Sequence, residues 1–276
     1  MNHPSYRFAY FGTPAVARDT LAILVESGFV PTLVVTFPDA PRGRGLALLP
    51  SPVKEAADER GLAVMTPEKL DAGTIAEIQK YDCDYAIVVA YGKIFPETLI
   101  GSFPKGVLNI HYSLLPKYRG ATPLEAALLA GESATGVTIQ KMASGLDTGD
   151  ILAQKEIPIA PGETARELRP KLILAGARLL VETLPSFEKG TLMPTPQGTS
   201  DTPLTRKLKK EDGLLSLDGP DEESWRKYRA YADTIGTYFF EGGKRMKIAK
   251  ASFTNGRFVV ERVIPEGKRE TSYQAR

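Results

Sequence analysis

Cysteine and histidine are scarce in this chain of 276 residues. Cys83 is the only cysteine, which excludes an internal disulfide and a zinc site built from several thiolates. His3 and His111 are the only histidines, so a metal site of several imidazoles is excluded as well. We expect no bound metal, and we expect Cys83 to be a structural thiol because it stands just before an apolar segment.

Long apolar runs are also missing. None approaches the roughly 20 residues that a membrane-spanning helix requires, and the first residues lack the apolar stretch of a secretory signal. Hydrophobic residues make up 42% and charged residues 25% of the chain, which is the composition of a globular protein with a sizeable core. We therefore expect a cytoplasmic protein.

The common nucleotide-binding motifs are absent too. Gly12-Thr13-Pro14 follows the first apolar segment, at the point where a dinucleotide fold carries G-x-G-x-x-G, but the further glycines are missing. Without them the backbone cannot approach a pyrophosphate closely. No Walker lysine loop is present either, so a bound dinucleotide is not expected.

Apolar segments of strand length alternate with segments of helical period. Such alternation is typical of βαβ units and predicts a doubly wound, mostly parallel α/β sheet. Three helices are each preceded by a threonine or serine and a proline, a pattern that favours a hydroxyl cap with proline in the first turn. The expected strands are 6–11, 30–37, 63–65, 85–90 and 107–110, and the expected helices are 15–28, 53–60 and 124–130.

The pattern changes after residue 110. Segments 136–142 and 151–157 predict a strand pair that brackets the loop 143–150. A helix over 172–184 follows, and Thr164 with Glu167 fits a capping box ahead of it. Pro170 opposes a helix that begins so early, so the start of this helix stays open.

Residues 192–204 contain three prolines and no periodicity, which predicts a linker. We expect a catalytic domain over 1–191 and a small C-terminal β-barrel domain, OB-like, over 205–276. Up to Leu204 the chain carries a net charge of −3, and the remainder carries +5. A basic C-terminal domain is consistent with an anionic partner such as nucleic acid, or simply with a solvated surface.

Asn109 and His111 form the first candidate site. Strand alternation places their side chains on one face at the end of a predicted strand. An amide and an imidazole can stabilise the oxyanion of an acyl transfer, and the imidazole can move a proton. A hydrogen-bonded structural pair is the alternative. Asp147 or Asp150 of the following loop can orient His111, and the spacing does not choose between them.

Several longer motifs carry a family resemblance. They are Phe11-Gly12-Thr13-Pro14, Asn109-Ile110-His111-x-Ser113-Leu114-Leu115-Pro116-x-x-Arg119-Gly120, Gly136-Val137-Thr138-Ile139 and Gly145-Leu146-Asp147-Thr148-Gly149-Asp150. With them the chain resembles the folate-dependent formyltransferase family, and within it the methionyl-tRNA formyltransferases. The resemblance covers most of the chain, including Pro265-Glu266-Gly267-Lys268 near its end.

The resemblance implies a function and its residues. It implies transfer of a formyl group from 10-formyltetrahydrofolate to the α-amine of methionine on initiator tRNA, with Asn109, His111 and Asp147 as the catalytic residues. The folate would contact the loop around Asp147 and two further segments, with Tyr91, Lys93, Ile94 and Phe95 in the first and Ser113, Leu114, Leu115 and Pro116 in the second.

The resemblance also implies how tRNA is bound. Arg42 and Arg44, on either side of Gly43 in the loop 38–50, would contact the acceptor stem, and Lys207, Lys209 and Lys210 would contact phosphates. We expect a monomer. The C-terminal domain is shorter than usual and lacks a segment rich in proline and tryptophan, so we expect its tRNA contacts to be reduced or rearranged. A sugar-nucleotide N-formyltransferase, a formyltetrahydrofolate hydrolase and a noncatalytic RNA-binding relative are the alternatives.

Overall fold

The computed structural model describes residues 7–42 and 46–274. They form two compact units. The first contains the chain up to residue 116 together with 137–155 and 173–200, and the second contains 117–136, 156–172 and 201–276.

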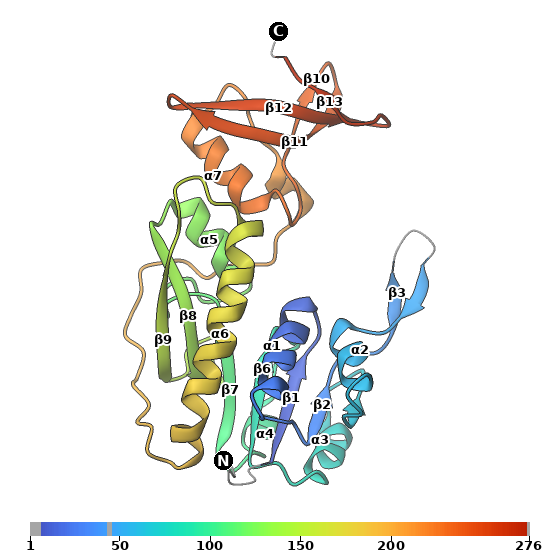
Figure 1. Ribbon diagram of the computed structural model, residues 1–276, viewed down its shortest axis with the longest axis vertical. Helices are drawn as coiled ribbons and strands as arrows, with labels where there is room; N and C mark the ends of the chain where they lie inside the picture. Colours follow the sequence, from blue (N-terminus) through green and yellow to red (C-terminus); the bar gives the residue numbers. More distant parts are fainter. Residues whose placement is uncertain (1–6, 43–45, 275–276) are drawn as a thin grey trace. The chain divides into compact units, whose positions relative to one another are not determined.

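A seven-stranded sheet is the frame of the first unit. Its strand order is β5-β2-β1-β6-β7-β8-β9 (Figure 1). The pairs β5–β2, β2–β1, β1–β6 and β6–β7 are parallel and β7–β8 is antiparallel, which confirms the predicted mostly parallel sheet. The strands are β1 (Phe8–Gly12), β2 (Leu33–Val35), β5 (Val64–Met65), β6 (Tyr85–Val89), β7 (Gly106–His111), β8 (Ala134–Lys141) and β9 (Ile151–Pro158).

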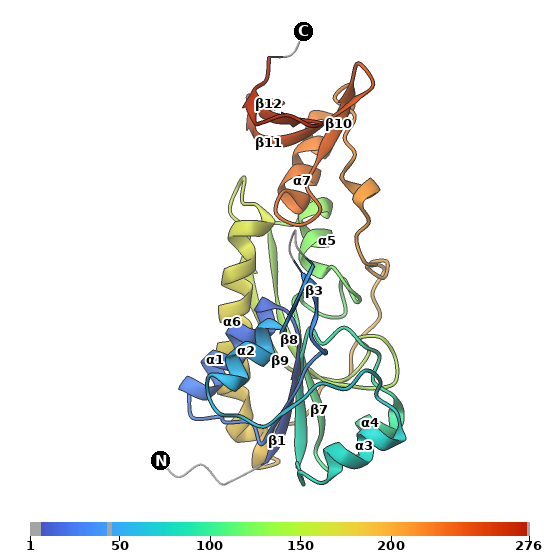
Figure 2. The same ribbon diagram turned by 90° about the vertical axis from the view of Figure 1, so that its right-hand side faces the viewer.

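Helices cover both faces of this sheet because its strands alternate their side chains between two apolar layers. Ala9 and Phe11 of β1 belong to a core cluster shared with helices α3 (Ala72–Gln79) and α4 (Glu97–Ile100). Tyr10 points the other way and donates to the carbonyl of Ala17 in helix α1 (Ala15–Glu26). Figure 2 shows α1 on one side of β1, and α3 and α4 on the other. Val107 of β7 lies in the α3/α4 cluster, so alternation also directs Asn109 and His111 to that face.

The three predicted hydroxyl caps have different outcomes. Ser51 accepts from the Lys54 N–H and caps α2 (Pro52–Asp58), as predicted. The prediction is wrong for Thr13 and Thr122, because both hydroxyls bond elsewhere. Thr13 donates to the carbonyl of Tyr91, and Thr122, ahead of α5 (Pro123–Ala130), donates to the carbonyl of Arg206.

The start of the long helix is settled by its first turn. Helix α6 runs over Ala165–Glu188, and the carboxylate of Glu167 accepts from both the N–H and the hydroxyl of Thr164. The helix therefore begins early and continues through Pro170. The sequence patterns missed α3, α4 and the hairpin of β3 (Ala40–Arg42) and β4 (Ala47–Leu49).

The second unit contains a four-stranded antiparallel sheet with the order β10-β11-β12-β13. Helix α7 (Asp221–Tyr231) contributes Trp225 and Tyr228 to its core, against Phe258. Within residues 201–274 the strand order is linear, and it is consistent with the predicted small β-domain. The strands are β10 (Tyr238–Glu241), β11 (Lys244–Thr254), β12 (Arg257–Pro265) and β13 (Thr271–Ser272), and a short 3-10 helix, η1, covers Lys210–Gly213. In the described chain, no helix is both long and apolar enough to cross a membrane.

Candidate functional site

The pairing of β7 with β8 brings the first site residues together. Asn109 lies opposite Gln140 and His111 lies opposite Thr138. Directly opposed residues of antiparallel strands share one face of the sheet, so these four side chains form a polar row. His111 is 5% exposed and Gln140 is 1% exposed, which makes this row a desolvated setting for chemistry.

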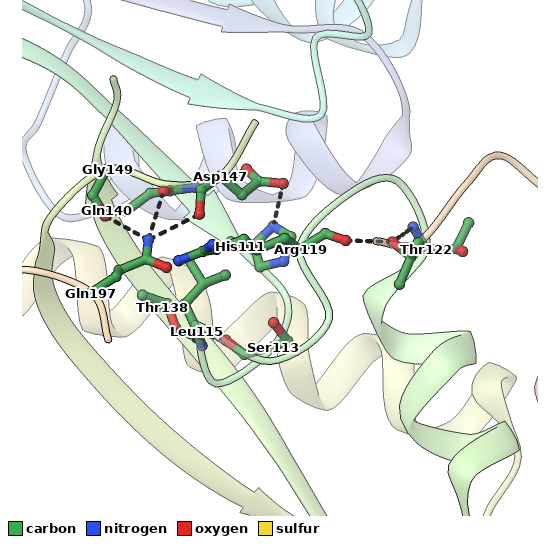
Figure 3. Close-up of polar contacts among 11 residues, drawn as sticks. His111, Ser113, Leu115, Arg119, Thr122, Thr138, Gln140, Asp147, Gly149 and Gln197 are labelled. Carbon is green, nitrogen blue, oxygen red and sulfur yellow. Dashed lines mark hydrogen bonds and ion pairs between the residues drawn. The ribbon is translucent and has the colours of Figure 1, made fainter. Parts of the chain in front are cut away.

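Asp147 is the carboxylate that the loop places beside His111. Its Oδ2 lies 3.6 Å from Nδ1 of His111, and the two side chains are 13% and 6% exposed (Figure 3). Its Oδ1 accepts a hydrogen bond of 2.8 Å from Nε2 of Gln140. Asp150 instead pairs through its main chain, accepting from the Lys141 N–H. The geometry therefore favours Asp147, the choice that residue spacing left open.

The backbone of the loop 143–150 is held in an uncommon conformation. Asp147 has φ +50°, a left-handed conformation that costs a non-glycine residue roughly 1–2 kcal/mol. Gly149 lies so close to the Lys141 carbonyl that an added Cβ would be 1.8 Å from the oxygen. Only glycine fits at that position, so the loop is packed tightly against the end of β8.

Gln197 joins the site from the segment predicted as a linker. Its Nε2 donates to the carbonyl oxygens of Asp147, at 2.9 Å, and of Gly149, at 2.5 Å (Figure 3). Thr195 and Ile151 exchange two backbone hydrogen bonds of 2.8 Å. At these positions the segment is therefore paired with the chain that leaves the loop.

Thr138 holds the segment Ser113–Pro116 in place. Its hydroxyl donates to the Ser113 carbonyl at 2.6 Å and accepts from the Leu115 N–H at 3.1 Å. Gln154 of β9 donates both to that hydroxyl and to the Leu115 carbonyl. Ser113 and Leu115 are buried, Leu114 and Pro116 are partly exposed, and the Leu115–Pro116 peptide is cis. This segment is fixed from two neighbouring strands.

The segment Tyr91–Phe95 follows β6. Tyr91 and Phe95 are buried in the core cluster, and burial raises the pKa of the Tyr91 hydroxyl to about 12. The Nζ of Lys93 donates to the carbonyls of Pro67 and Glu68 and lies 4.6 Å from the centre of the Phe37 ring. Desolvation lowers the pKa of this amine. Ile94, in contrast, is 94% exposed. Ile94 is therefore the side chain of this segment most available to a ligand.

The predicted tRNA residues lie in both units. Arg42 ends β3 in the first unit, and Arg44 lies outside the described residues. Lys207, Lys209 and Lys210 are exposed in the second unit. The neighbouring Arg206 is bound by both carboxylate oxygens of Asp212, whose pKa this hydrogen bond lowers to about 2. The three lysines and Arg206 are all exposed, and Arg206 is the one of these four whose side chain is paired with Asp212.

The thiol of Cys83 is structural. Cys83 is 8% exposed in the core cluster, and burial raises the pKa of its thiol to about 11, as expected of a thiol that is not a nucleophile. Over residues 7–42 and 46–274, no group of three His, Cys, Asp or Glu side chains is arranged to hold a metal ion.

The sheet and its polar row can be compared with known protein families. The family model of the formyl transferases fits residues 6–184. The chain therefore belongs to the formyl transferase family.

Its relatives are more specific. The chain is 41% identical over 244 residues to the methionyl-tRNA formyltransferase of Geobacter metallireducens, which covers 88% of this chain and 78% of that protein. It is 43% identical over 244 residues to the methionyl-tRNA formyltransferase of Koribacter versatilis, with the same coverage. Among solved structures, an N-formyltransferase of Helicobacter canadensis in complex with folinic acid and dTDP-3-aminofucose shares the fold, with a TM-score of 0.70 and 20% identity over 91% of this chain and 88% of that one.

Proposed function

We propose that this protein transfers the formyl group of 10-formyltetrahydrofolate to the α-amine of methionine on initiator tRNA. The observation that carries the proposal is the polar row of β7 and β8, with Asn109 and His111 on one face and Asp147 beside the imidazole. The identity of about 40% to methionyl-tRNA formyltransferases favours this acceptor over a sugar nucleotide, since the sugar N-formyltransferases it resembles are 17% and 18% identical.

Asn109 and His111 act on the formyl oxygen. When the amine nitrogen attacks the formyl carbon, that oxygen gains negative charge, and the two side chains donate hydrogen bonds to it. Preorganised donors in a desolvated site typically contribute about 3–4 kcal/mol each to transition-state stabilisation. The new carbon–nitrogen bond replaces the bond to N10 of the folate, and the proton lost by the amine is returned to N10.

Asp147 sets the orientation of the imidazole. Because its carboxylate faces Nδ1 of His111, the proton of a neutral ring is favoured at Nδ1 and Nε2 is left toward the reacting atoms, while a protonated ring donates from Nε2. Asp147 also stabilises the positive charge that the imidazole gains when Nε2 takes the amine proton through water; in that protonated form Nε2 donates to the formyl oxygen before the proton passes to N10.

We place the folate against the exposed Ile94 and the fixed segment Ser113–Pro116, with Tyr91, Lys93 and Phe95 forming the support beneath. Ile94 supplies apolar contact area. Within Ser113, Leu114, Leu115 and Pro116, the Ser113 carbonyl and both peptide groups of Leu115 are held by Thr138 and Gln154. The peptide groups of Leu114, fixed in position between them, can read the polar edge of the pterin.

For tRNA, we propose that different parts of the chain perform the transfer and add further binding contacts. Residues 1–191 perform the transfer, with Arg42 and Arg44 contacting the acceptor stem, and residues 205–276, after the linker 192–204, add sequence-independent contacts. Lys207, Lys209 and Lys210 are exposed, so they can neutralise phosphates, and binding should weaken as salt rises.

The experiment is to incubate the protein with methionyl initiator tRNA and 10-formyltetrahydrofolate and to determine the mass of the aminoacyl product. We expect the addition of one formyl group, and Asn109→Ala should lower kcat by about 100- to 1,000-fold with folding retained. Consumption of the folate with water or a small amine, and no formylated tRNA, would refute the acceptor. No turnover by folded protein on any acceptor would instead favour a noncatalytic RNA-binding protein.

A further inference from the structure

We propose that Gln197 is a positioning residue of the active site, which acts through Asp147. This inference rests on the proposed function for its catalytic part. Gln197 lies within the segment that the sequence marks as a linker, yet its side chain reaches the catalytic loop, fifty residues away along the chain.

The contacts of Gln197 are directed at the loop backbone. Its single amide nitrogen donates to the carbonyls of Asp147 and Gly149, one at the residue with the left-handed backbone and the other two residues further on. A non-glycine residue keeps such a conformation when its surroundings fix it from several sides. Gln197 supplies that constraint from outside the loop.

The carboxylate of Asp147 is held by a different glutamine. Gln140 donates to Oδ1, while Oδ2 faces His111. Gln140 fixes the side chain and Gln197 fixes the main chain, and the two amides are 3.5 Å apart, from Nε2 of Gln197 to Oε1 of Gln140. Together they determine where Oδ2 lies relative to the imidazole.

Gln197 is itself anchored. The two backbone hydrogen bonds between Thr195 and Ile151 fix the chain two residues before it, next to the start of β9. The linker segment is therefore one wall of the site, and displacement of residues 195–197 would release the loop 143–150.

The catalytic test compares Gln197→Ala and Gln197→Glu with Gln79→Ala, which changes an exposed glutamine of α3. We expect both Gln197 variants to lower kcat by about 10- to 50-fold and to leave KM for each substrate within about threefold, because an interaction that serves only the transition state affects kcat. Gln197→Glu keeps the size of the side chain but replaces the donor with a carboxylate that faces two carbonyls. Wild-type kcat in Gln197→Glu would overturn the proposal, because only packing would then matter.

The link to Asp147 is tested with a double-mutant cycle. In the Asp147→Asn background, Gln197→Ala should lower kcat by less than about threefold beyond the loss caused by Asp147→Asn alone, since the effects of residues that act as one unit are not additive. An equal loss in both backgrounds would show that Gln197 does not act through Asp147.

A readout independent of turnover separates this inference from the proposed function. Hydrogen exchange followed by mass spectrometry should show faster exchange in peptides covering 143–150 in Gln197→Ala, with α1 and the β10–β13 sheet unchanged. Unchanged exchange in the loop would overturn the proposal that Gln197 holds the loop, whatever the protein formylates. Faster exchange in the loop of a protein that does not formylate tRNA would support the role of Gln197 and refute tRNA as the acceptor.

Discussion

Thr138→Val tests how the site is supported. The substitution keeps the size and branching of the side chain and removes a fully buried hydroxyl. That hydroxyl takes part in three hydrogen bonds, with the Ser113 carbonyl, the Leu115 N–H and the side-chain amide of Gln154. At about 1 kcal/mol each, their loss should lower the free energy of unfolding by about 3 kcal/mol.

The same change should affect the donor substrate. Ser113–Pro116 loses one of its two supports, so part of the binding energy of the folate must order that segment. A cost of about 1.4 kcal/mol raises KM for 10-formyltetrahydrofolate on the order of tenfold, with KM for the tRNA unchanged. Urea unfolding followed by circular dichroism and initial-rate kinetics measure the two effects.

Thr183→Val is the matched control. Thr183 is also buried, but its hydroxyl donates only to the Leu179 carbonyl within α6 among the hydrogen bonds of the described chain. We expect a loss of at most about 1 kcal/mol and no change in either KM. The reasoning fails if Thr138→Val destabilises the protein no more than Thr183→Val, or if its KM for the folate is that of the wild type.

Two further predictions concern stability and reactivity. Ser51→Ala should cost about 1–2 kcal/mol of unfolding free energy, because Ser51 caps α2 and its oxygen lies 2.6 Å from the Thr36 hydroxyl; urea unfolding measures this loss, and a change under about 0.3 kcal/mol would contradict it. Burial raises the pKa of Cys83 from 9.0 to about 11, so at pH 8 the thiolate fraction is lower by a factor on the order of 100 in the folded protein than in the unfolded chain. Its alkylation by iodoacetamide, followed by mass spectrometry, should be slower by at least that factor and should accelerate about tenfold per pH unit up to pH near 11; equal rates in folded and urea-unfolded protein would refute this assignment.

The fold was predictable where the signal is local. Apolar runs marked the strands of the sheet, and the Ser51 cap and the Thr164–Glu167 pair marked two helix starts. Helix α3 was missed because its capping residue is Asp71, whereas the predicted helix starts are each a hydroxyl residue followed by proline. The same rule failed at Thr13 and Thr122, whose hydroxyls found carbonyl partners distant in the sequence.

The site residues, too, were predictable only where the signal is local. Strand alternation predicted that Asn109 and His111 share a face, because both lie on one strand. Gln140 and Gln154 carried no signal, and Thr138 was marked only as part of a family motif, because the roles of all three depend on the register of β7 with β8 and on the neighbouring strand β9. Gln197 was hidden by its context, since prolines and polar residues predict a linker whether or not one amide in it reaches a loop fifty residues earlier.

The polar row also has a consequence for the order in which the site assembles. The hydrogen bonds in and around the row join residues at increasing distances along the chain: Gln140 and Asp147 are 7 residues apart, Thr138 and Ser113 are 25 apart, and Gln154 and Leu115 are 39 apart. The entropy cost of closing a loop grows only slowly with its length, so all of these contacts can form once β9 has been made. Gln197 comes after the whole of α6 in the chain, so in a growing polypeptide its hydrogen bonds to the loop 143–150 cannot form until that helix has been made. During synthesis, the loop next to His111 is therefore fixed only after α6 has been made, so catalytic competence follows the formation of the strands that carry the site.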